Sequence, residues 1–257
     1  MSDSSYGERR AHPGRFRCCG VLIDGLAPEA ATQALLTSRH GTARRIHLCD
    51  TVTLAHALRD AEFRDLLNAA RLNLPADNRL VRTGRQHGHG NLTGRIDARD
   101  LMLATLSQGR EQGLKHFLYG HDQATVERLH KNLETRLPGV DIVGTGSFTH
   151  QLSPDEAEEL TDLVRAAAPD LVWVGLDTPL KDGFVAAYAA RFAATLVPVG
   201  RVFEQLAGRR PASGGRWRRH LLGSAVYYYG TLTDGRRSRR LDREAAGVAT
   251  SAGPSRR

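Results

Sequence analysis

Short apolar runs alternate along the chain with longer segments in which apolar residues recur every three or four positions. The clearest run, Leu171–Val174, is bounded by Asp170 and Gly175 and is too short for a helix, so it predicts a strand buried on both faces. Similar runs predict strands over residues 15–24, 46–49, 72–75, 116–120, 140–144 and 195–200. The alternation predicts an α/β fold with a Rossmann-like parallel sheet flanked by helices and an N-terminal α/β lobe packed against it.

Helix-start signals lie between these runs. Pro28 opens one helix, Asp50-Thr51 opens another, and Ser153-Pro-Asp-Glu156 is a capping box with proline at the first helical position. Apolar spacing predicts further helices over residues 62–70, 97–112, 125–137, 183–192 and 221–229. One face of the helix over 183–192 is expected to carry Phe184, Ala187, Tyr188 and Arg191.

These segments divide the chain into two lobes and two ends. Residues 15–113 are predicted to form the N-terminal lobe and 114–230 the Rossmann-like lobe, with disordered ends at 1–14 and 231–257. We expect no signal peptide, because residues 1–14 are polar, and no membrane span, because no stretch approaches ~20 apolar residues. Cys18, Cys19 and Cys49 form no CxxC pair and are predicted to be reduced and buried, as in a cytoplasmic protein.

Basic residues are concentrated near the two ends. Lys and Arg outnumber Asp and Glu by 36 to 28, and segments 8–17 and 236–257 account for this whole excess. We expect a solvated, partly disordered tail, with contact to an anionic membrane surface or to RNA as the alternative. The aromatic content of 6% is low for a binder of single-stranded nucleic acid, so nucleic acid is not the expected partner.

Two predicted strands finish on carboxylates, Asp50 and Asp77. Parallel strands would place both at one edge of the sheet, where acid/base chemistry is common. The alternative is that each aspartate is an N-cap or turn residue.

The segment 79–92 is basic and rich in glycine and histidine, and it is predicted to be a loop near the site. Its Arg82 and Arg85 could contact a phosphate. His87-Gly-His89 suggests metal binding only weakly, because no third ligand lies nearby in the sequence.

Glycine ends four of the predicted strands. Gly120, Gly144, Gly175 and Gly200 could let a ligand approach the backbone, and a following helix would offer free amide donors to a phosphate. Alternatively, each glycine simply terminates a strand. Neither a dinucleotide fingerprint nor a P-loop is present, which disfavours a usual NAD or NTP site and leaves open a diphosphate bound by several strand ends.

From about Arg17 to Tyr229 the order of segments resembles the WecG/TagA/CpsF glycosyltransferases, which move an N-acetylhexosamine-type sugar from a UDP donor to a lipid-linked acceptor. The resemblance is carried by Asp60-Ala-Glu-Phe63, Leu74-Pro-Ala-Asp77, Phe117-Leu-Tyr-Gly120, Val140–Gly144, Gly175–Asp182 and Val199–Gly208. The family patterns for the last two are Gly-x-Pro-Lys-Gln-Glu and Gly-Gly-x-Phe-Asp-x-x-Ala-Gly.

The resemblance implies that Asp77 is the catalytic base. In the mechanism that we expect, Lys181, Arg201 and strand-end amides stabilise the negative charge that grows on the departing UDP. Lys181 and Asp182 replace the family's glutamine and glutamate, Asp50 an asparagine, Asn78 and Ala98 glycines, and Glu204 an aspartate. The remaining expected substrate contacts are Thr51, Arg82, Arg85, Gly120, His121, Gly144, Gly175, Thr178, Gly200 and Arg201. The family's Glu-Trp-x-Tyr-Arg is missing around 223–229, so the acceptor is expected to be specialised, such as a small molecule of secondary metabolism.

The sequence therefore predicts an inverting, metal-independent transfer from a UDP-sugar to an acceptor hydroxyl, with no cofactor. The absence of an Asp-x-Asp pair agrees with a leaving group held without a metal. Lys181 could instead pair with Asp182 and have no catalytic role. The alternatives are a nucleotide-dependent oxidoreductase, an RNA or membrane-surface binder, and a degenerate family member that binds nucleotide without transfer; a homo-oligomer is also considered.

Overall fold

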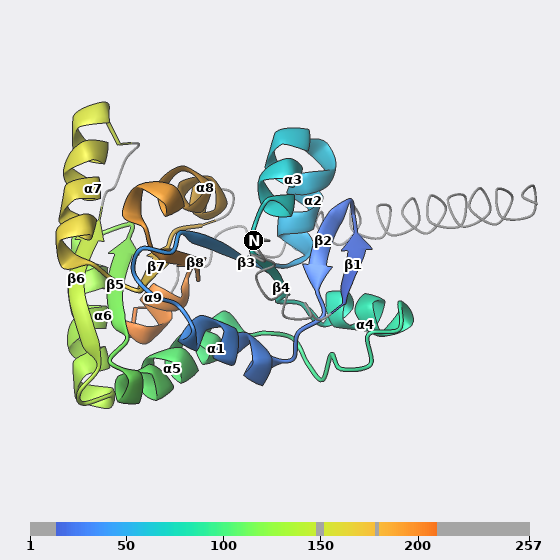
Figure 1. Ribbon diagram of the computed structural model, residues 1–257, viewed down its shortest axis with the longest axis horizontal. Helices are drawn as coiled ribbons and strands as arrows, with labels where there is room; N and C mark the ends of the chain where they lie inside the picture. The colour runs from blue at the N-terminus through green and yellow to red at the C-terminus, as the bar shows by residue number, and fades with distance from the viewer. Residues whose placement is uncertain (1–13, 148–151, 178–179, 210–257) are drawn as a thin grey trace, which may run out of the picture.

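The computed structural model describes residues 14–147, 152–177 and 180–209 (Figure 1). In chain order its elements are β1 (Arg15–Cys18), β2 (Val21–Asp24), α1 (Pro28–Leu36), β3 (Arg44–Cys49), α2 (Thr51–Arg59), α3 (Ala61–Asn68), β4 (Leu72–Pro75), α4 (Asn78–Gln86), α5 (Ala98–Gly109), η1 (Arg110–Gln112), β5 (Lys115–Gly120), α6 (Gln123–Arg136), β6 (Asp141–Ser147), α7 (Pro154–Ala167), β7 (Leu171–Gly175), α8 (Leu180–Phe192), β8 (Thr195–Pro198) and α9 (Val202–Leu206).

Six of the strands form one parallel sheet in the order β4-β3-β8-β7-β5-β6. The predicted α/β class and the Rossmann-like sheet are therefore confirmed. Strands from both predicted lobes take part, because β3 and β4 come from the N-terminal half and β5 to β8 from the second half.

The sheet is least continuous between β3 and β8. Only Arg44 and Arg45 of β3 pair with β8, opposite Thr195 and Leu196, whereas residues 46–49 pair with β4 alone. The carboxyl halves of β3 and β8 are thus not paired with each other. The sheet opens toward its carboxyl edge at this junction, which is where the strand order brings the two halves of the chain together.

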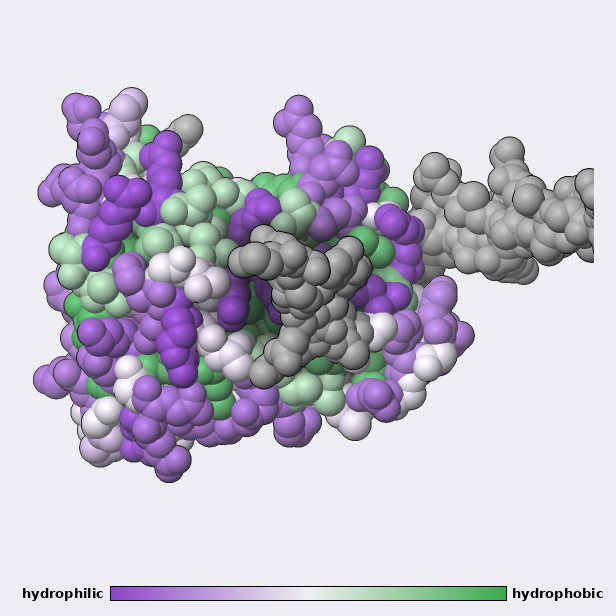
Figure 2. Space-filling model, viewed as in Figure 1, coloured by the Kyte–Doolittle hydropathy of each residue, from purple (hydrophilic) through white to green (hydrophobic). Residues whose placement is uncertain are grey.

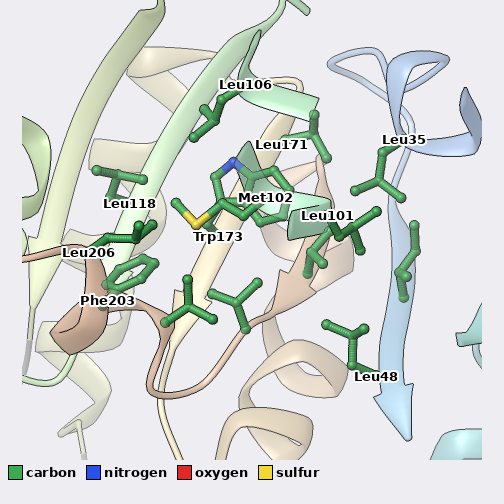
Figure 3. Packing of buried hydrophobic residues seen from close by; sticks show 14 of the residues in the cluster. Leu35, Leu48, Leu101, Met102, Leu106, Leu118, Leu171, Trp173, Phe203 and Leu206 are labelled. Atoms are coloured by element: carbon green, nitrogen blue, oxygen red, sulfur yellow. The ribbon is translucent and has the colours of Figure 1, made fainter. Parts of the chain in front are cut away.

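Helices cover both faces of the sheet (Figure 1). On one face α1, α5, α6 and α9 enclose the largest apolar cluster, which includes Leu35, Leu101, Trp173 and Phe203 (Figure 3). On the other face α7 and α8 cover a second cluster around Phe184. The outer surfaces over α7 and α3 are largely hydrophilic, whereas the surface over α8 is more apolar (Figure 2). Residues of β7 alternate between the two clusters, as expected for a strand buried on both faces.

The segment predicted as one strand over 15–24 is instead a hairpin. β1 and β2 pair antiparallel, and the turn between them places Cys19 at φ 53° and Gly20 at φ 78°. The hairpin packs beside β4, where Asn73 donates its backbone N–H to Asp24 Oδ2 at 2.7 Å and its side-chain amide to the carbonyl of Leu22 at 2.9 Å. This contact covers the edge of the sheet at β4.

Two further predictions at the ends of elements need correction. Residues 78–86 form α4 where a loop was predicted, and Gly84 is accommodated in this helix because it packs closely against Leu92 and Phe16. β6 continues to Ser147, so Gly144 lies inside the strand and does not end it.

The helix after β7 also differs from the prediction. It begins at Leu180, so Lys181 and Asp182 belong to its first turn and not to a loop. Its buried apolar residues are Phe184, Val185, Ala189 and Phe192, whereas Ala187 and Arg191 are exposed, so the buried side of the helix includes Phe184 but not the whole predicted face.

Several local predictions are confirmed. β7 is buried along its whole length, Pro28 is the first residue of α1, and Ser153 and Glu156 form the reciprocal capping box. The three cysteines are free and buried. No helix in the described ranges has the length and apolar character needed to cross a membrane. The predicted ends at 1–14 and 231–257, apart from Gly14, and the helix over 221–229 lie outside the described residues.

Candidate active site

Asp50 and Asp77 lie at the carboxyl ends of neighbouring strands. Asp50 follows β3 directly, Asp77 follows β4 by two residues, and the final residues of these strands, Cys49 and Pro75, are paired. The hydroxyl of Thr51 donates to Asp77 Oδ2 at 3.3 Å and joins the two strand ends. The predicted convergence of two carboxylates at one edge is therefore present.

Each of these aspartates is also a helix N-cap. Asp50 Oδ1 accepts the backbone N–H and the hydroxyl of Thr53, and Asp77 Oδ1 accepts the N–H of Arg79 at 2.7 Å. Capping occupies one oxygen of each carboxylate. Apart from the hydroxyl of Thr51 on Asp77, neither Oδ2 accepts a hydrogen bond from another described residue. The capping interpretation is thus correct, yet it leaves an oxygen of Asp77 for other chemistry.

An ion pair stands across the opening from Asp77. Asp177, which follows β7, accepts from Nε and Nη2 of Arg201, each at 3.3 Å. Arg201 follows Gly200, whose φ of 61° makes the turn after β8. In the sheet β3 alone lies between β4 and β8, so Asp77 and Arg201 follow strands that are next but one to each other.

Glu204, in the first turn of α9, brings a second carboxylate to this side of the edge. Burial raises its pKa, Asp177 and Asp122 raise it further, and its own backbone N–H and Arg201 oppose the shift. Its Oε2 is buried and has no hydrogen-bond partner in the described part of the chain. Such an oxygen can accept a hydrogen bond from a ligand hydroxyl.

Asp122 lies beyond Glu204, at the end of β5. Arg209 Nη1 donates to Asp122 Oδ1 at 3.0 Å and to the hydroxyl of Thr125. Partial burial acts to raise the pKa of Asp122, but the hydrogen bonds from Thr125 and Arg209 outweigh it and the pKa is lowered. This carboxylate therefore stays ionised and fixes the segment after α9 to the start of α6.

Lys181 is the buried cation of the site. Only 8% of its surface is exposed, and within the described ranges its ammonium group has no hydrogen-bond or ion-pair partner. Asp182 does not pair with it, because Asp182 Oδ1 is bonded to Nδ1 of His47 at 2.7 Å. The alternative, in which Lys181 forms an ion pair with Asp182, is therefore not present in the structure.

The strand glycines have structural reasons of their own. A Cβ on Gly175 would lie 2.5 Å from the ring of Phe203, and one on Gly120 would lie 2.4 Å from Val126. At Gly144 the obstacle is the ring of Phe117, at 2.6 Å. These three positions are small because large side chains pack on them. Only Gly200 has a turn conformation that favours glycine.

The other predicted contacts are spread around this edge. Arg82 on α4 is exposed, as are Asn78 and His121. The guanidinium of Arg85 donates instead to the carbonyl groups of Leu92 and Thr93, so it holds the loop after α4. Thr178 lies outside the described residues.

The two histidines of the loop after α4 are used in packing. Their rings lie 6.2 Å (His87) and 5.3 Å (His89) from the ring of Phe16. Among the described residues no group of three or more His, Cys, Asp or Glu side chains is arranged to hold a metal. The weak metal interpretation of this histidine pair therefore gains no support from the structure.

Sequence reasoning missed three residues of this region: His47, Asp122 and Asp177. Asp122 and Asp177 each follow a predicted strand within two residues, the same signal that identified Asp50 and Asp77. His47 lies inside a short apolar strand and carries no such signal. Its partner, Asp182, is 135 residues away in the chain.

Comparison with known proteins gives two matches. A sequence model described as the glycosyl transferase WecG/TagA/CpsF family matches residues 16–228, which include every described element from β2 to α9. Over 153 residues the chain is 26% identical to a Bacillus spizizenii protein named N-acetylglucosaminyldiphosphoundecaprenol N-acetyl-beta-D-mannosaminyltransferase. That match covers 59% of this chain and 58% of the relative's length.

Proposed function

The chain belongs to the WecG/TagA/CpsF glycosyltransferase family, and on this premise we propose that it transfers a hexosamine-type sugar from a UDP-sugar to an acceptor hydroxyl with inversion. The observation that carries the proposal is the division of charge at the sheet edge. Asp77 follows β4, whereas Lys181 belongs to the helix that follows β7 and Arg201 follows β8. A donor spanning the opening would meet a base at one end and cations at the other.

In the proposed reaction Asp77 is the general base. Its Oδ1 is held by the amide of Arg79, which fixes the carboxylate, and its Oδ2 takes the proton of the acceptor hydroxyl. The acceptor oxygen then attacks the anomeric carbon from the face opposite to UDP. One bond to oxygen forms as the bond to the diphosphate breaks, which inverts the anomeric centre.

Negative charge develops on UDP as this bond breaks. Lys181, Arg201 and the positive end of α8 would stabilise that charge, and the low exposure of Lys181 would make its contribution larger than in bulk water. These groups support the proposed metal-independent departure of UDP. Asp50, Thr51, Asn78, Arg82, His121 and Glu204 are the proposed further substrate contacts.

We propose a specialised acceptor, with a small molecule as the first class to test. The sequence supports this choice, because the family's Glu-Trp-x-Tyr-Arg is missing around 223–229. The relative from Bacillus spizizenii is named for a transfer to a lipid-linked sugar. A polyprenol diphosphate-sugar is therefore the second class to include, and transfer to this class alone would contradict the small-molecule proposal.

Calorimetric titration with UDP, UDP-N-acetylhexosamines and NAD tests the donor assignment. We expect UDP to bind and NAD not to bind. Lys181→Met and Arg201→Ala should each weaken UDP binding by about tenfold or more, because each removes a charge-assisted contact. Lys131→Met is the matched control, since Lys131 is an exposed lysine on α6.

Three results would separate the alternatives. Binding of NAD without UDP would favour an oxidoreductase and contradict the proposal. UDP affinity unchanged by both variants would refute the placement of the diphosphate. UDP binding without sugar transfer to any acceptor of either class would identify a degenerate member of the family.

A further inference from the structure

His47 and Asp182 form a hydrogen-bonded pair inside the protein. Nδ1 of His47 lies 2.7 Å from Asp182 Oδ1, and both side chains are fully buried. A carboxylate only accepts hydrogen bonds, so the ring must donate its Nδ1 hydrogen to Asp182. The contact is short, which is typical of a hydrogen bond to a charged group.

Each partner depends on the other. His47 Nε2 and Asp182 Oδ2 have no hydrogen-bond partner among the residues the structure describes. Burying a carboxylate without a hydrogen-bond donor costs free energy. If the imidazole were removed, Asp182 would therefore tend to move out of its buried position. The position of the first turn of α8 is therefore tied to the ring on β3.

The pair is placed where the sheet itself provides no link. His47 lies two residues after Arg45, the last residue of β3 that pairs with β8, and Asp182 belongs to the helix after β7. The hydrogen bond thus joins the β3 and β4 side of the opening to the α8 side. Ile46 and Leu48, the neighbours of His47 in β3, face the opposite cluster, as strand alternation requires.

The same turn of α8 carries Lys181. Leu180 is 70% exposed, whereas Lys181 and Asp182 are buried, so the rotation of the helix about its axis decides which of these side chains faces inward. Burial raises the pKa of the Cys49 thiol, the carboxylate of Asp182 raises it further, and the ammonium of Lys181 acts against both. Lys181 and Asp182 therefore both lie near the end of β3.

We propose that His47 is a positioning residue that acts through Asp182 to hold Lys181 inward, beside the carboxyl half of β3. The role of Lys181 on a diphosphate rests on the proposed function. Its buried position and its dependence on His47 do not. The two claims can therefore be tested separately.

Chemical labelling of lysines measures the position without any ligand. The chain has three lysines, Lys115, Lys131 and Lys181, and the first two are exposed. With trace acetic anhydride and mass spectrometry, we expect Lys181 to react at least about tenfold more slowly than the other two in the native protein. Lys115 and Lys131 serve as internal references in every variant.

Three variants test the dependence on His47. His47→Leu removes the donor and should bring the labelling rate of Lys181 close to that of Lys131. His47→Asn places an amide N–H near the position of Nδ1 and should keep the protection. Because an unpaired Asp182 could prevent folding, His47→Leu combined with Asp182→Leu replaces the pair by apolar side chains and should also release Lys181.

UDP titration of the same proteins supplies the second readout. His47→Leu should weaken UDP binding by about tenfold, and should have little effect in a Lys181→Met background, because the two changes act through one group. Rapid labelling of Lys181 in the native protein, or protection that persists in both leucine variants, would overturn the inference. Labelling as expected without any UDP binding would leave the positioning role intact and refute the proposed function.

Discussion

The ring of Phe203 lies directly against Gly175, so that a Cβ at position 175 would come within 2.5 Å of its nearest ring atom. This contact seats α9 on the end of β7. Arg201, just before α9, and Glu204, next to Phe203, are carried by the same contact to the carboxyl edge of the sheet. A packing constraint in the core therefore sets the place of two candidate ligand-binding side chains.

Gly175→Ala should destabilise the protein by about 2 kcal/mol, because the added methyl group must displace a buried aromatic ring. Denaturant unfolding measures this change. Gly183→Ala is the matched control, since a Cβ at that position of α8 would meet no described atom within 4 Å outside its chain neighbours and the backbone of its own helix. The control should stabilise the protein by about 0.5 to 1 kcal/mol through helix propensity. Equal stability of the two variants would contradict the packing role of Gly175.

The strands were predictable because their signals are local. Leu171–Gly175 and Lys115–Gly120 are short apolar runs, and their burial follows from composition alone. The hairpin at Cys19 and Gly20 was not predictable in this way, because cysteine rarely occupies a turn position with positive φ. Its turn is compatible with the fold because tertiary contacts with β4 hold the two strands.

His116 makes the stability of the core sensitive to acid. Burial lowers its pKa to about 4, Asp170 opposes the shift, and Nδ1 of the ring is 3.3 Å from Nε1 of Trp173, which donates to it. The unfolded chain binds a proton near the ordinary value of 6.5, so it holds more protons than the folded protein between these two pH values. Folding stability should fall as pH decreases through this window, by about 3 kcal/mol from this residue.

Urea unfolding at several pH values between about 7 and about 4 checks this expectation. His116→Asn retains an acceptor for the indole N–H of Trp173 and lacks a titratable group. Its stability should therefore decrease less steeply with acid than that of the native protein. If the unfolding free energies of the two proteins change equally with pH, His116 is not the source of the acid sensitivity.

Glu204 should have the opposite pH dependence. Its pKa is raised mainly by burial, so the folded protein holds this proton more tightly than the unfolded chain. The stability from the neutral carboxyl is present below the ordinary pKa and is lost as pH rises through the raised value. Glu204→Gln mimics the protonated form, and its advantage over the native protein should grow as pH rises.

Thermal unfolding of Glu204→Gln at about pH 4 and about pH 7 measures this advantage. Glu158→Gln provides the control, because Glu158 is exposed on α7. If the melting temperatures of Glu204→Gln and the native protein differ by the same amount at both pH values, the raised pKa of Glu204 is contradicted.

The candidate site was predictable only in part, for a physical reason. Asp50 and Asp77 follow apolar runs, and parallel strands must end at one edge, so their convergence follows from the sequence. Other features depend on contacts between separate segments. Arg85 donates to carbonyl groups of the loop after α4, and His47 pairs with Asp182. No local pattern reports such contacts.

The central claim is that Asp77 accepts the proton of the attacking hydroxyl. Asp77→Asn keeps a side-chain acceptor for the N-cap of α4, so its melting temperature should change little. Asp60→Asn makes the matched change at the N-cap of α3, and its melting temperature should also change little.

Transfer from a UDP-sugar, measured together with UDP affinity by calorimetry, tests this claim most directly. We predict that Asp77→Asn lowers kcat by about 100-fold to 10,000-fold with UDP affinity unchanged, and that Asp60→Asn retains full activity. Full transfer activity in Asp77→Asn, with UDP still bound, would contradict the account.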